Sequence, residues 1–317
     1  MSATGFDPGW LRLRLHWQGG RIGAVGVDLS RPNAVAILRG RPADQAARML
    51  PLLYSICGAA QGVAAALALR AARGESVGAG VSADALTEAR REHLWRLLLD
   101  WPQVLGLPSQ EGLLVAGRRQ LQAGGFDAWA TATLREPLAR IDEALRDLPE
   151  PAAADVRLLP ALTAAETLAL WPRLDAAFAA APSFHGSAAE TGALARYPEL
   201  AGAPPLRARV KARMTDLAEA SGLGLASAAT VAPGVGRATV ETARGLLMHE
   251  VTLDGERIAD YVIVAPTEWN FHAAGVLEAW LEGAVAASAD EAKFLASRAV
   301  LALDPCVRSE IEVSVGA

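Results

Sequence analysis

The chain has 317 residues, a formal net charge of −5 at pH 7 and a sequence pI near 5.6. Hydrophobic residues make up 52% of it and charged residues 21%, which excludes an intrinsically disordered chain. The acidic balance, without a basic stripe, argues against nucleic acid as a partner. Aromatic residues are only 5% and alanine is abundant, so we expect helices to dominate the fold.

Neither the N-terminal residues nor the apolar segments indicate export or membrane insertion. Residues 1–8 lack the basic and apolar regions of a signal peptide. The apolar run from Val63 to Leu69 is too short to span a bilayer. We therefore expect a cytoplasmic protein without a membrane span, whose two cysteines stay reduced rather than form a disulfide.

The N-terminal part of the chain predicts a β-hairpin followed by helices. Apolar and polar residues alternate over residues 10–17, two glycines follow, and a second strand pattern ends at residue 28. Residues 42–72 predict a long helical region that Pro51 should end or kink. Residues 87–100 predict a strongly periodic helix that Trp101-Pro102 should stop.

The rest of the chain predicts helices and then three strands. The expected helices are at 110–122, 128–148, 161–180 and 206–220, the strands at 236–241, 245–253 and 257–265, and two final helices at 273–287 and 290–300. Asp254-Gly255, between the second and third strands, is a strong hairpin signal.

The predicted fold class is α+β and mainly α. We expect one domain over residues 1–317, with an N-terminal hairpin at about 10–28 and a helical body at about 42–222. A β-hairpin and the C-terminal helices should occupy about 236–317.

The two cysteines, Cys57 and Cys306, are the first candidates for chemistry. Each by itself fits a small buried or idle thiol, which is the common role of a free cysteine. Two thiolates from opposite ends of a chain can also hold one soft metal fragment, although they cannot complete a tetrahedral site without other ligands. Their spacing alone does not decide between these roles.

Short motifs around the cysteines occur together and in a fixed order. They are Arg39-Gly40-Arg41, Ile56-Cys57-Gly58, Ala243-Arg244-Gly245, His249, Asp254-Gly255, Ile258, Tyr261, Pro266-Thr267-Glu268-Trp269-Asn270 and Asp304-Pro305-Cys306. Their order and spacing resemble the large subunit of nickel–iron hydrogenases over residues 8–70 and 236–312. This resemblance implies a hydrogenase-large-subunit-like helical bundle with small peripheral antiparallel β-hairpins.

The chain departs from that family at positions that complete its metal site. In the family, the second cysteine of each pair bridges nickel and iron, and here these positions are Ala60 and Ser309. Two family histidine positions are Ala64 and Glu312, and the family's proton-relay Glu-Gly-His is here Pro8-Gly9-Trp10. The resemblance therefore implies two surviving terminal thiolates and no complete bimetallic centre.

The segment Ile56-Cys57-Gly58-Ala59-Ala60-Gln61 and the truncated C-terminal motif resemble the HupK/HoxV-type hydrogenase maturation proteins, which are degenerate relatives of the large subunit. This resemblance implies a non-enzymatic scaffold that transiently carries an iron fragment with two cyanides and one carbon monoxide, Fe(CN)2CO. The implied partners are small iron-delivery maturation chaperones and the hydrogenase large-subunit precursor. Nickel is not expected to bind.

Within this interpretation, Cys57 and Cys306 are the predicted iron ligands, and Arg244 and Thr267 are predicted to contact the cofactor. A guanidinium at Arg244 can neutralise an anionic cyanide–thiolate fragment, and the alternative is a strand-end arginine in a surface salt bridge. Thr267 can donate to a cyanide, or it can cap the following helix. Gln61, Ser309 and Glu312 are weaker ligand candidates that also fit free surface positions.

The helix at 87–100 carries further polar residues with structural interpretations. Glu92 and Arg96 have the spacing of an ion pair on a solvated or interface face. His93 fits a satisfied structural histidine better than a group lining a metal cavity. At the level of function, the alternatives to a scaffold are a metal-free structural adaptor for maturation proteins and an active hydrogenase-like oxidoreductase.

Overall fold

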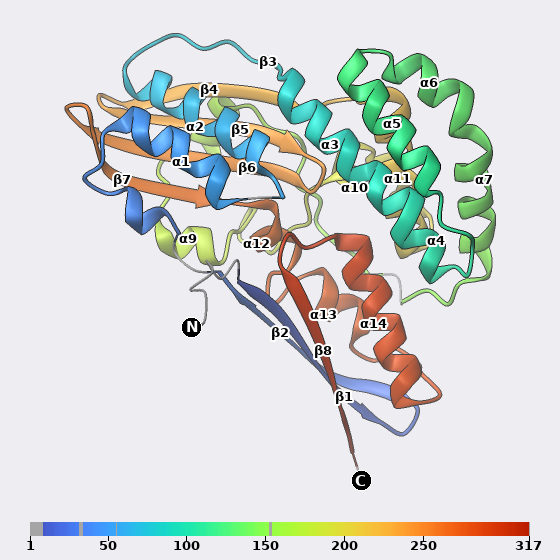
Figure 1. The fold of residues 1–317 in the computed structure, drawn as a ribbon. Helices are drawn as coiled ribbons and strands as arrows, with labels where there is room; N and C mark the ends of the chain where they lie inside the picture. Colours follow the sequence, from blue (N-terminus) through green and yellow to red (C-terminus); the bar gives the residue numbers. More distant parts are fainter. Residues whose placement is uncertain (1–8, 32–33, 55, 152–153, 317) are drawn as a thin grey trace, which may run out of the picture.

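The computed structural model describes residues 9–31, 34–54, 56–151 and 154–316, and Figure 1 shows their arrangement. Two β-sheets are joined and covered by helices. Within the described ranges, no helix combines the length and the apolar character needed to cross a lipid bilayer. The mainly helical α+β fold class is confirmed.

The smaller sheet brings the two ends of the chain together. It has the order β2-β1-β8, built from β1 (Trp10–Gln18), β2 (Arg21–Ser30) and β8 (Arg308–Val315). The first two strands form the predicted antiparallel hairpin, whereas β8 lies parallel to β1. The blue and red strands lie side by side in Figure 1. This pairing places the residues that follow β2 beside those that precede β8.

The larger sheet is antiparallel with the order β3-β4-β5-β6-β7. Its strands are β3 (Gly80–Val81), β4 (Leu225–Ala232), β5 (Val235–Thr242), β6 (Gly245–Asp254) and β7 (Arg257–Val264). Helices α1 (Ala43–Leu53) and α2 (Gly58–Ala72) lie over one face (Figure 1). A Cβ on Gly236 would lie 2.2 Å from the backbone oxygen of Ala68, so this glycine permits close packing of α2 on β5.

A group of helices packs beside the larger sheet and, through its last two members, against the smaller one (Figure 1). Its members are α3 (Ala83–Trp95), a π-helical turn (Arg96–Asp100), α4 (Trp101–Val104), α5 (Glu111–Ala123), α6 (Phe126–Thr133), α7 (Arg135–Ala144), α11 (Pro205–Glu219), α13 (Val276–Leu281) and α14 (Ala289–Leu303). The largest hydrophobic core joins many of these helices to β1 and β2, with Trp101, Phe271 and Trp280 buried in it.

Short helices complete the described structure. They are α8 (Ala164–Leu170), α9 (Ala176–Ala180), α10 (Ala193–Arg196), α12 (Pro266–Asn270) and the 3-10 turns at Ala34–Leu38, Leu145–Asp147 and Pro198–Gly202. Helix α9 lies near β7, on the side of the sheet away from α2 (Figure 1).

One of the two proline-based helix boundaries is wrong. The 42–72 region is interrupted near Pro51 as expected, because α1 ends two residues after this proline and α2 begins at Gly58. Pro102 does not stop the helix at 87–100, because the chain passes through the π-helical turn into α4. Pro102 lies in the first turn of α4, where a missing backbone N–H costs least.

Three predicted long helices are interrupted. Residues 128–148 form the end of α6, then α7 and a 3-10 turn, and residues 161–180 contain α8 and α9. Residues 273–287 contain only the short α13. Strands β3, β4 and β8 were not predicted, and the alanine-rich β4 in particular shows pairing with β5 overriding helix propensity.

Candidate metal site

The backbone holds each cysteine at a helix end. Cys57 is the N-cap residue of α2, and the carboxylate of Glu88 accepts hydrogen bonds from the first backbone N–H groups of that helix, Ala59 at 2.7 Å and Ala60 at 3.1 Å. A carboxylate at a helix N-terminus also complements the helix dipole. Glu88 therefore fixes the start of α2 and the cysteine that precedes it.

Cys306 follows a sharp stop at the end of α14. Asp304 adopts a left-handed conformation with φ of 58°, which aspartate tolerates better than most residues, and Pro305 cannot continue the helix. Cys306 then lies immediately before β8. Both cysteines are free and half-buried.

Two donors surround the sulfur of Cys306. The hydroxyl of Thr267, a buried residue of α12, lies 3.0 Å from Sγ, and Nη1 of Arg31 donates to the same sulfur at 3.4 Å. Arg31 also pairs with Glu268, with Nε 3.3 Å from Oε1. Burial disfavours the charge of Arg31, but Glu268 and Cys306 outweigh it and raise the pKa of this guanidinium.

The sulfur of Cys57 accepts a hydrogen bond from Nε2 of Gln61 at 3.6 Å. Burial, followed by the nearby charge of Cys306, raises the pKa of Cys57 to about 12. Cys57 without a metal is therefore a neutral thiol at pH 7, and a metal must displace its proton. Because the charge of Cys306 acts on Cys57, the two cysteines lie in the same region of the structure.

Arg244 lies in the turn between β5 and β6 and is only 5% exposed. Its Nε donates to the backbone oxygen of Asp304 at 3.1 Å, and its Nη2 lies 3.3 Å from the Asp304 carboxylate and 3.0 Å from that of Glu92. Burial opposes its charge, but Asp304, then Cys306, raises the pKa of Arg244. Arg244 is thus a buried cation within electrostatic range of Cys306 and, more weakly, of Cys57.

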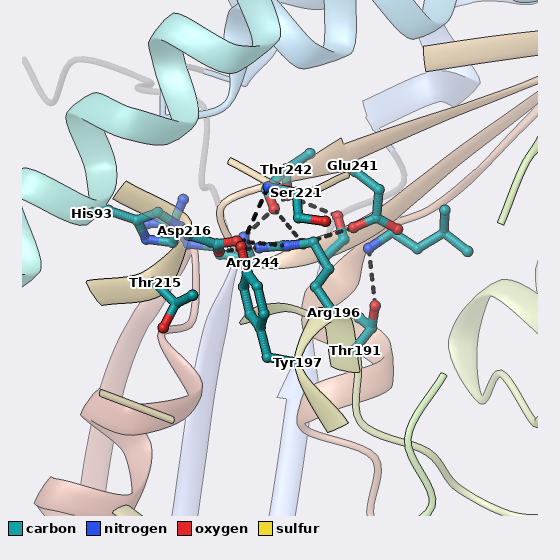
Figure 2. Close-up of polar contacts among 12 residues, drawn as sticks. His93, Thr191, Arg196, Tyr197, Thr215, Asp216, Ser221, Glu241, Thr242 and Arg244 are labelled. Carbon is teal, nitrogen blue, oxygen red and sulfur yellow. Dashed lines mark hydrogen bonds and ion pairs between the residues drawn. The ribbon is translucent and has the colours of Figure 1, made fainter. Parts of the chain in front are cut away.

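A buried ionic network supports the turn that carries Arg244 (Figure 2). Asp216 of α11 accepts hydrogen bonds from His93 at 2.9 Å and from Nη2 of Arg196 at 2.5 Å. Arg196 also donates to Glu241 at 2.7 Å and to the backbone oxygen of Thr242 at 3.3 Å. Burial alone would raise the pKa of Asp216, but Arg196 and His93 hold it well below its usual range.

Side chains also fix the backbone of Arg244 itself. The hydroxyl of Thr242 accepts from the Arg244 backbone N–H at 3.2 Å, and the amide of Asn270 donates to the Arg244 backbone oxygen at 3.1 Å. The network and these two bonds together orient the guanidinium toward the end of α14.

The donor set fits a metal fragment that brings ligands of its own. Among the residues that the structure describes, no cluster of three or more His, Cys, Asp or Glu side chains could hold a metal ion. The site offers two sulfurs, the cations Arg31 and Arg244, and the donors Thr267 and Gln61. Soft sulfur ligands and surrounding donors suit a soft, anionic fragment whose remaining ligands accept hydrogen bonds.

The structure places the four predicted site residues Cys57, Cys306, Arg244 and Thr267 around this region. Two alternatives for them are wrong. Arg244 is not in a surface salt bridge, and Thr267 does not cap α12, whose N-cap residue is Ala265.

Of the weaker ligand candidates, two lie at the surface and one is buried beside a cysteine. Ser309 and Glu312 are exposed on β8, as the surface interpretation expects, whereas Gln61 is fully buried beside Cys57. Pro8, from the predicted relay position, lies outside the described residues.

The expectations for helix α3 were partly wrong. Arg96 pairs with Asp304 and Asp100 rather than with Glu92, which contacts Arg244 instead. The expected solvated face is therefore half-buried and packs against the site. His93 is the satisfied structural histidine that was expected, paired with Asp216.

Sequence reasoning did not find Arg31. It follows an ordinary β-strand, and only the pairing of β1 with β8 brings it to Cys306. Glu268 belongs to the motif at residues 266–270, but its ion pair with Arg31 was not foreseen, because it too depends on the position of Arg31 in the folded chain.

Comparisons with known proteins agree on one family. No family model matches the chain. It is 36% identical to the hydrogenase expression/formation protein HupK of Azotobacter vinelandii, covering 96% of this chain and 98% of that protein. It is 31% identical to the hydrogenase expression/formation protein HoxV of Cupriavidus necator, covering 94% of this chain and 95% of that protein.

Solved structures with the same fold are hydrogenases. The Ni-Fe-Se hydrogenase of D. vulgaris Hildenborough in the as-isolated oxidised state matches with a TM-score of 0.67 and 16% identity, over 91% of this chain and 94% of that chain. The reduced, active Ni-Fe-Se hydrogenase of Desulfomicrobium baculatum matches with a TM-score of 0.64 and 13% identity, over 92% and 95%. These likenesses show the fold, and the nearly full-length relatives show that the chain belongs to the HupK/HoxV family of hydrogenase expression/formation proteins.

Proposed function

We propose that this protein is a non-enzymatic maturation scaffold that holds the Fe(CN)2CO fragment before its transfer to a hydrogenase large subunit. The observation that supports the proposal is that Cys57 and Cys306 come from opposite ends of the chain, yet Cys306 lies close enough to raise the pKa of Cys57, and each sulfur has a hydrogen-bond donor beside it. Family membership supports a role in hydrogenase formation.

A carrier must release its cargo, and the small ligand set suits this requirement. Two thiolates can bind a soft iron fragment whose cyanide and carbonyl ligands fill its other positions. The positions of the two bridging cysteines are occupied by the buried Ala60 and the exposed Ser309, neither of which offers a thiolate. Because this protein offers fewer sulfur ligands, transfer of the iron fragment to a partner with more sulfur ligands is favoured. Nickel is not part of the proposal.

The surrounding residues have separate roles in this proposal. Arg244 and Arg31 offset the negative charge of two thiolates and two cyanides, because each cation lies within electrostatic range of both sulfurs. The hydroxyl of Thr267 donates either to Cys306 or to a cyanide nitrogen. These contacts hold the fragment without adding a metal–ligand bond that would slow its release.

The partners in this proposal are small iron-delivery chaperones and the large-subunit precursor. A cavity of about 330 Å³ is lined by Arg31, Glu268 and Tyr54, and Arg31 also donates a hydrogen bond to the sulfur of Cys306. Its other lining residues are largely apolar, including the short helix α9. Such a cavity can admit a ligand group from a partner that exchanges the metal fragment.

Infrared spectroscopy of anaerobically purified protein, produced together with the maturation proteins, tests the proposal. We expect cyanide and carbonyl stretching bands in the wild type and their loss in Cys57→Ala and in Cys306→Ala. Ser309→Ala is the matched control, because Ser309 is exposed on β8, and it should retain the bands.

Two results would contradict the proposal in different ways. Carefully prepared wild type without these bands would favour a metal-free adaptor. Stoichiometric nickel together with hydrogen oxidation by the purified protein would show an active hydrogenase-like oxidoreductase instead.

A further inference from the structure

Three buried side chains form a line of hydrogen bonds from the larger sheet to Cys57. The hydroxyl of Tyr261 on β7 lies 2.9 Å from Nδ1 of His249 on β6, and Nε2 of His249 lies 2.8 Å from Oε1 of Gln61 on α2. Nε2 of Gln61 donates to the Cys57 sulfur at 3.6 Å. Gln61 and His249 are fully buried and Tyr261 is 6% exposed. We call Tyr261, His249 and Gln61 the hydrogen-bond line.

The far end of the hydrogen-bond line decides its direction. Burial raises the pKa of Tyr261 well above its usual range, so the hydroxyl keeps a proton that needs an acceptor. Within the described part of the chain, Nδ1 of His249 is the hydrogen-bond partner of this hydroxyl. Burial also lowers the pKa of His249 to about 3, so its ring is neutral and has a single N–H. Because Tyr261 donates to Nδ1, that N–H must lie on Nε2.

His249 in turn decides which end of the Gln61 amide faces Cys57. Its Nε2–H donates, so it requires the carbonyl end of the amide, and Oε1 of Gln61 lies there. The NH₂ end of the amide is therefore directed at the Cys57 sulfur. This direction is set at Tyr261 and stays the same whatever occupies the site, because a reversed line would leave the Tyr261 proton without an acceptor on His249.

Two further side chains near the sulfurs can only donate hydrogen bonds. Nη1 of Arg31 donates to Cys306, and the buried Arg244 lies within electrostatic range of both cysteines. A guanidinium has no acceptor. A cyanide nitrogen is an acceptor, whereas the water ligands of a hydrated metal ion carry hydrogens that need acceptors. A site surrounded by donors therefore distinguishes between these two kinds of metal fragment.

We propose that Tyr261 and His249 are positioning residues that keep Gln61 directed as a donor into the site, and that this fixed polarity selects a fragment with hydrogen-bond-accepting ligands over hydrated metal ions. The inference rests on the proposed function, because it takes the site to hold the iron fragment. It adds a determinant of selectivity that the cysteines do not supply, since thiolates also bind ions such as Zn²⁺.

The tautomer of His249 in metal-free protein tests the direction of the hydrogen-bond line. The ring nitrogens of ¹⁵N-labelled histidine are followed by NMR at pH 7, and His249→Gln assigns the signals by their disappearance. We expect the proton of His249 to lie on Nε2 in the wild type, and a mixture of both tautomers in Tyr261→Phe. Tyr197→Phe is the matched control, because the Tyr197 hydroxyl accepts from the Ser221 backbone N–H instead, and it should behave like the wild type.

Infrared spectra of protein produced with the maturation proteins test the selection. Tyr261→Phe lies three hydrogen bonds from the Cys57 sulfur, and we expect it to shift or split at least one cyanide band, because Gln61 then adopts both orientations. Gln61→Glu replaces the donor by an acceptor of the same shape. It should lose the cyanide bands, and its metal-free form should bind Zn²⁺ about 10- to 100-fold more tightly than the wild type. Gln45→Glu, exposed on α1, should change neither property.

The possible outcomes separate this inference from the proposed function. If the wild type carries no cyanide bands, both proposals are overturned. If the wild type carries the bands but His249 has its proton on Nδ1, the direction of the hydrogen-bond line is wrong and only this inference is overturned. The same conclusion follows if Tyr261→Phe has the wild-type spectrum or if Gln61→Glu keeps the bands.

Discussion

His249 lies between Gln61 and Tyr261 in the interior, where burial lowers its pKa to about 3. His93, paired with Asp216, has its pKa lowered in the same direction by burial. Histidine in an unfolded chain has a pKa near 6.5. Below about pH 6.5, therefore, these two histidines are protonated in the unfolded chain. In the folded protein they stay neutral to a lower pH.

This difference predicts how stability depends on pH. Between about pH 6.5 and pH 3 the unfolded state binds more protons at residue 249, so the free energy of unfolding falls as the pH falls. The stabilising contribution of neutral His249 is complete above about pH 6.5. Below that pH, the free energy of unfolding falls with a slope that approaches about 1.4 kcal/mol per pH unit for one residue. Urea unfolding of metal-free protein from pH 8 to pH 5 measures it, and His249→Gln should reduce the slope.

The half-buried His16 on β1 supplies the control. His16→Gln should leave the acid slope close to that of the wild type. An equal slope in wild type and His249→Gln would mean that His249 takes up its proton without unfolding the protein.

Single residues of the site were foreseen to different degrees. Cys57, Cys306, Arg244 and Thr267 stand in short motifs whose order along the chain is visible in the sequence. Arg31 has no such motif, and its contact with Cys306 depends on a strand pairing between the chain ends. A local pattern cannot reveal a contact between residues about 275 positions apart.

Among the elements, α2 carries Cys57 and depends on close packing against β5. Its side facing the sheet contains the fully buried Ala64, Ala65, Ala68 and Ala71, whose small side chains allow the backbones to approach. Gly236 completes this contact on β5, because any side chain there meets the backbone of α2. The contact also fixes the distance between Cys57 and the residues carried by the sheet.

We predict that Gly236→Ala destabilises the protein by about 3 kcal/mol, at the upper end of the usual cost of overpacking. The added Cβ would lie 2.2 Å from the backbone oxygen of Ala68 and 2.3 Å from the backbone nitrogen of Ala72, so α2 must shift. The free energy of unfolding from urea titration measures the effect.

Gly112→Ala is the matched control for this prediction. Gly112 lies in α5, and a Cβ there has no heavy atom within 4 Å. Because alanine favours a helix over glycine by up to about 1 kcal/mol, this change should leave stability equal or slightly higher. Equal losses in both variants would show that close packing at Gly236 is unimportant.

The elements recovered from the sequence are those with local signals. The alternating N-terminal hairpin, the strands on either side of Asp254-Gly255 and the helices near 110–122 and 206–220 all have such signals. β4 is rich in alanine and has no strand-like composition, so it becomes a strand because β5 offers it an unpaired edge. β8 does carry a local signal, because Glu310, Glu312 and Ser314 alternate with Ile311, Val313 and Val315, and sequence reasoning missed it.

Across the whole molecule, buried ion pairs join the helical part to the larger sheet. Arg196 on α10 forms ion pairs with Asp216 on α11 and with Glu241 on β5, and its side chain is only 2% exposed. Burial raises the pKa of Glu241, against the opposing effect of Arg196. Since this network also supports the turn of Arg244, global stability and the geometry of the site are linked (Figure 2).

We predict that Arg196→Met destabilises the protein by about 3–5 kcal/mol, because it leaves the buried Asp216 without its ion-pair partner and Glu241 without a cation. Arg140→Met is the matched control, since Arg140 forms an exposed pair with Glu136 in α7. Exposed pairs contribute at most about 1 kcal/mol. Urea unfolding of both variants measures the difference, and similar small effects would contradict a central role for this network.

The sequence by itself determined the helical character of the chain, the N-terminal hairpin and the two cysteine motifs with their missing bridging partners. These features depend on nearby residues or on short motifs, so they are readable without coordinates. The tertiary structure decided which donors surround each sulfur, the burial of Arg244 and the line from Cys57 to Tyr261. These depend on strand pairing and helix packing between distant segments, and on the desolvation that this packing produces.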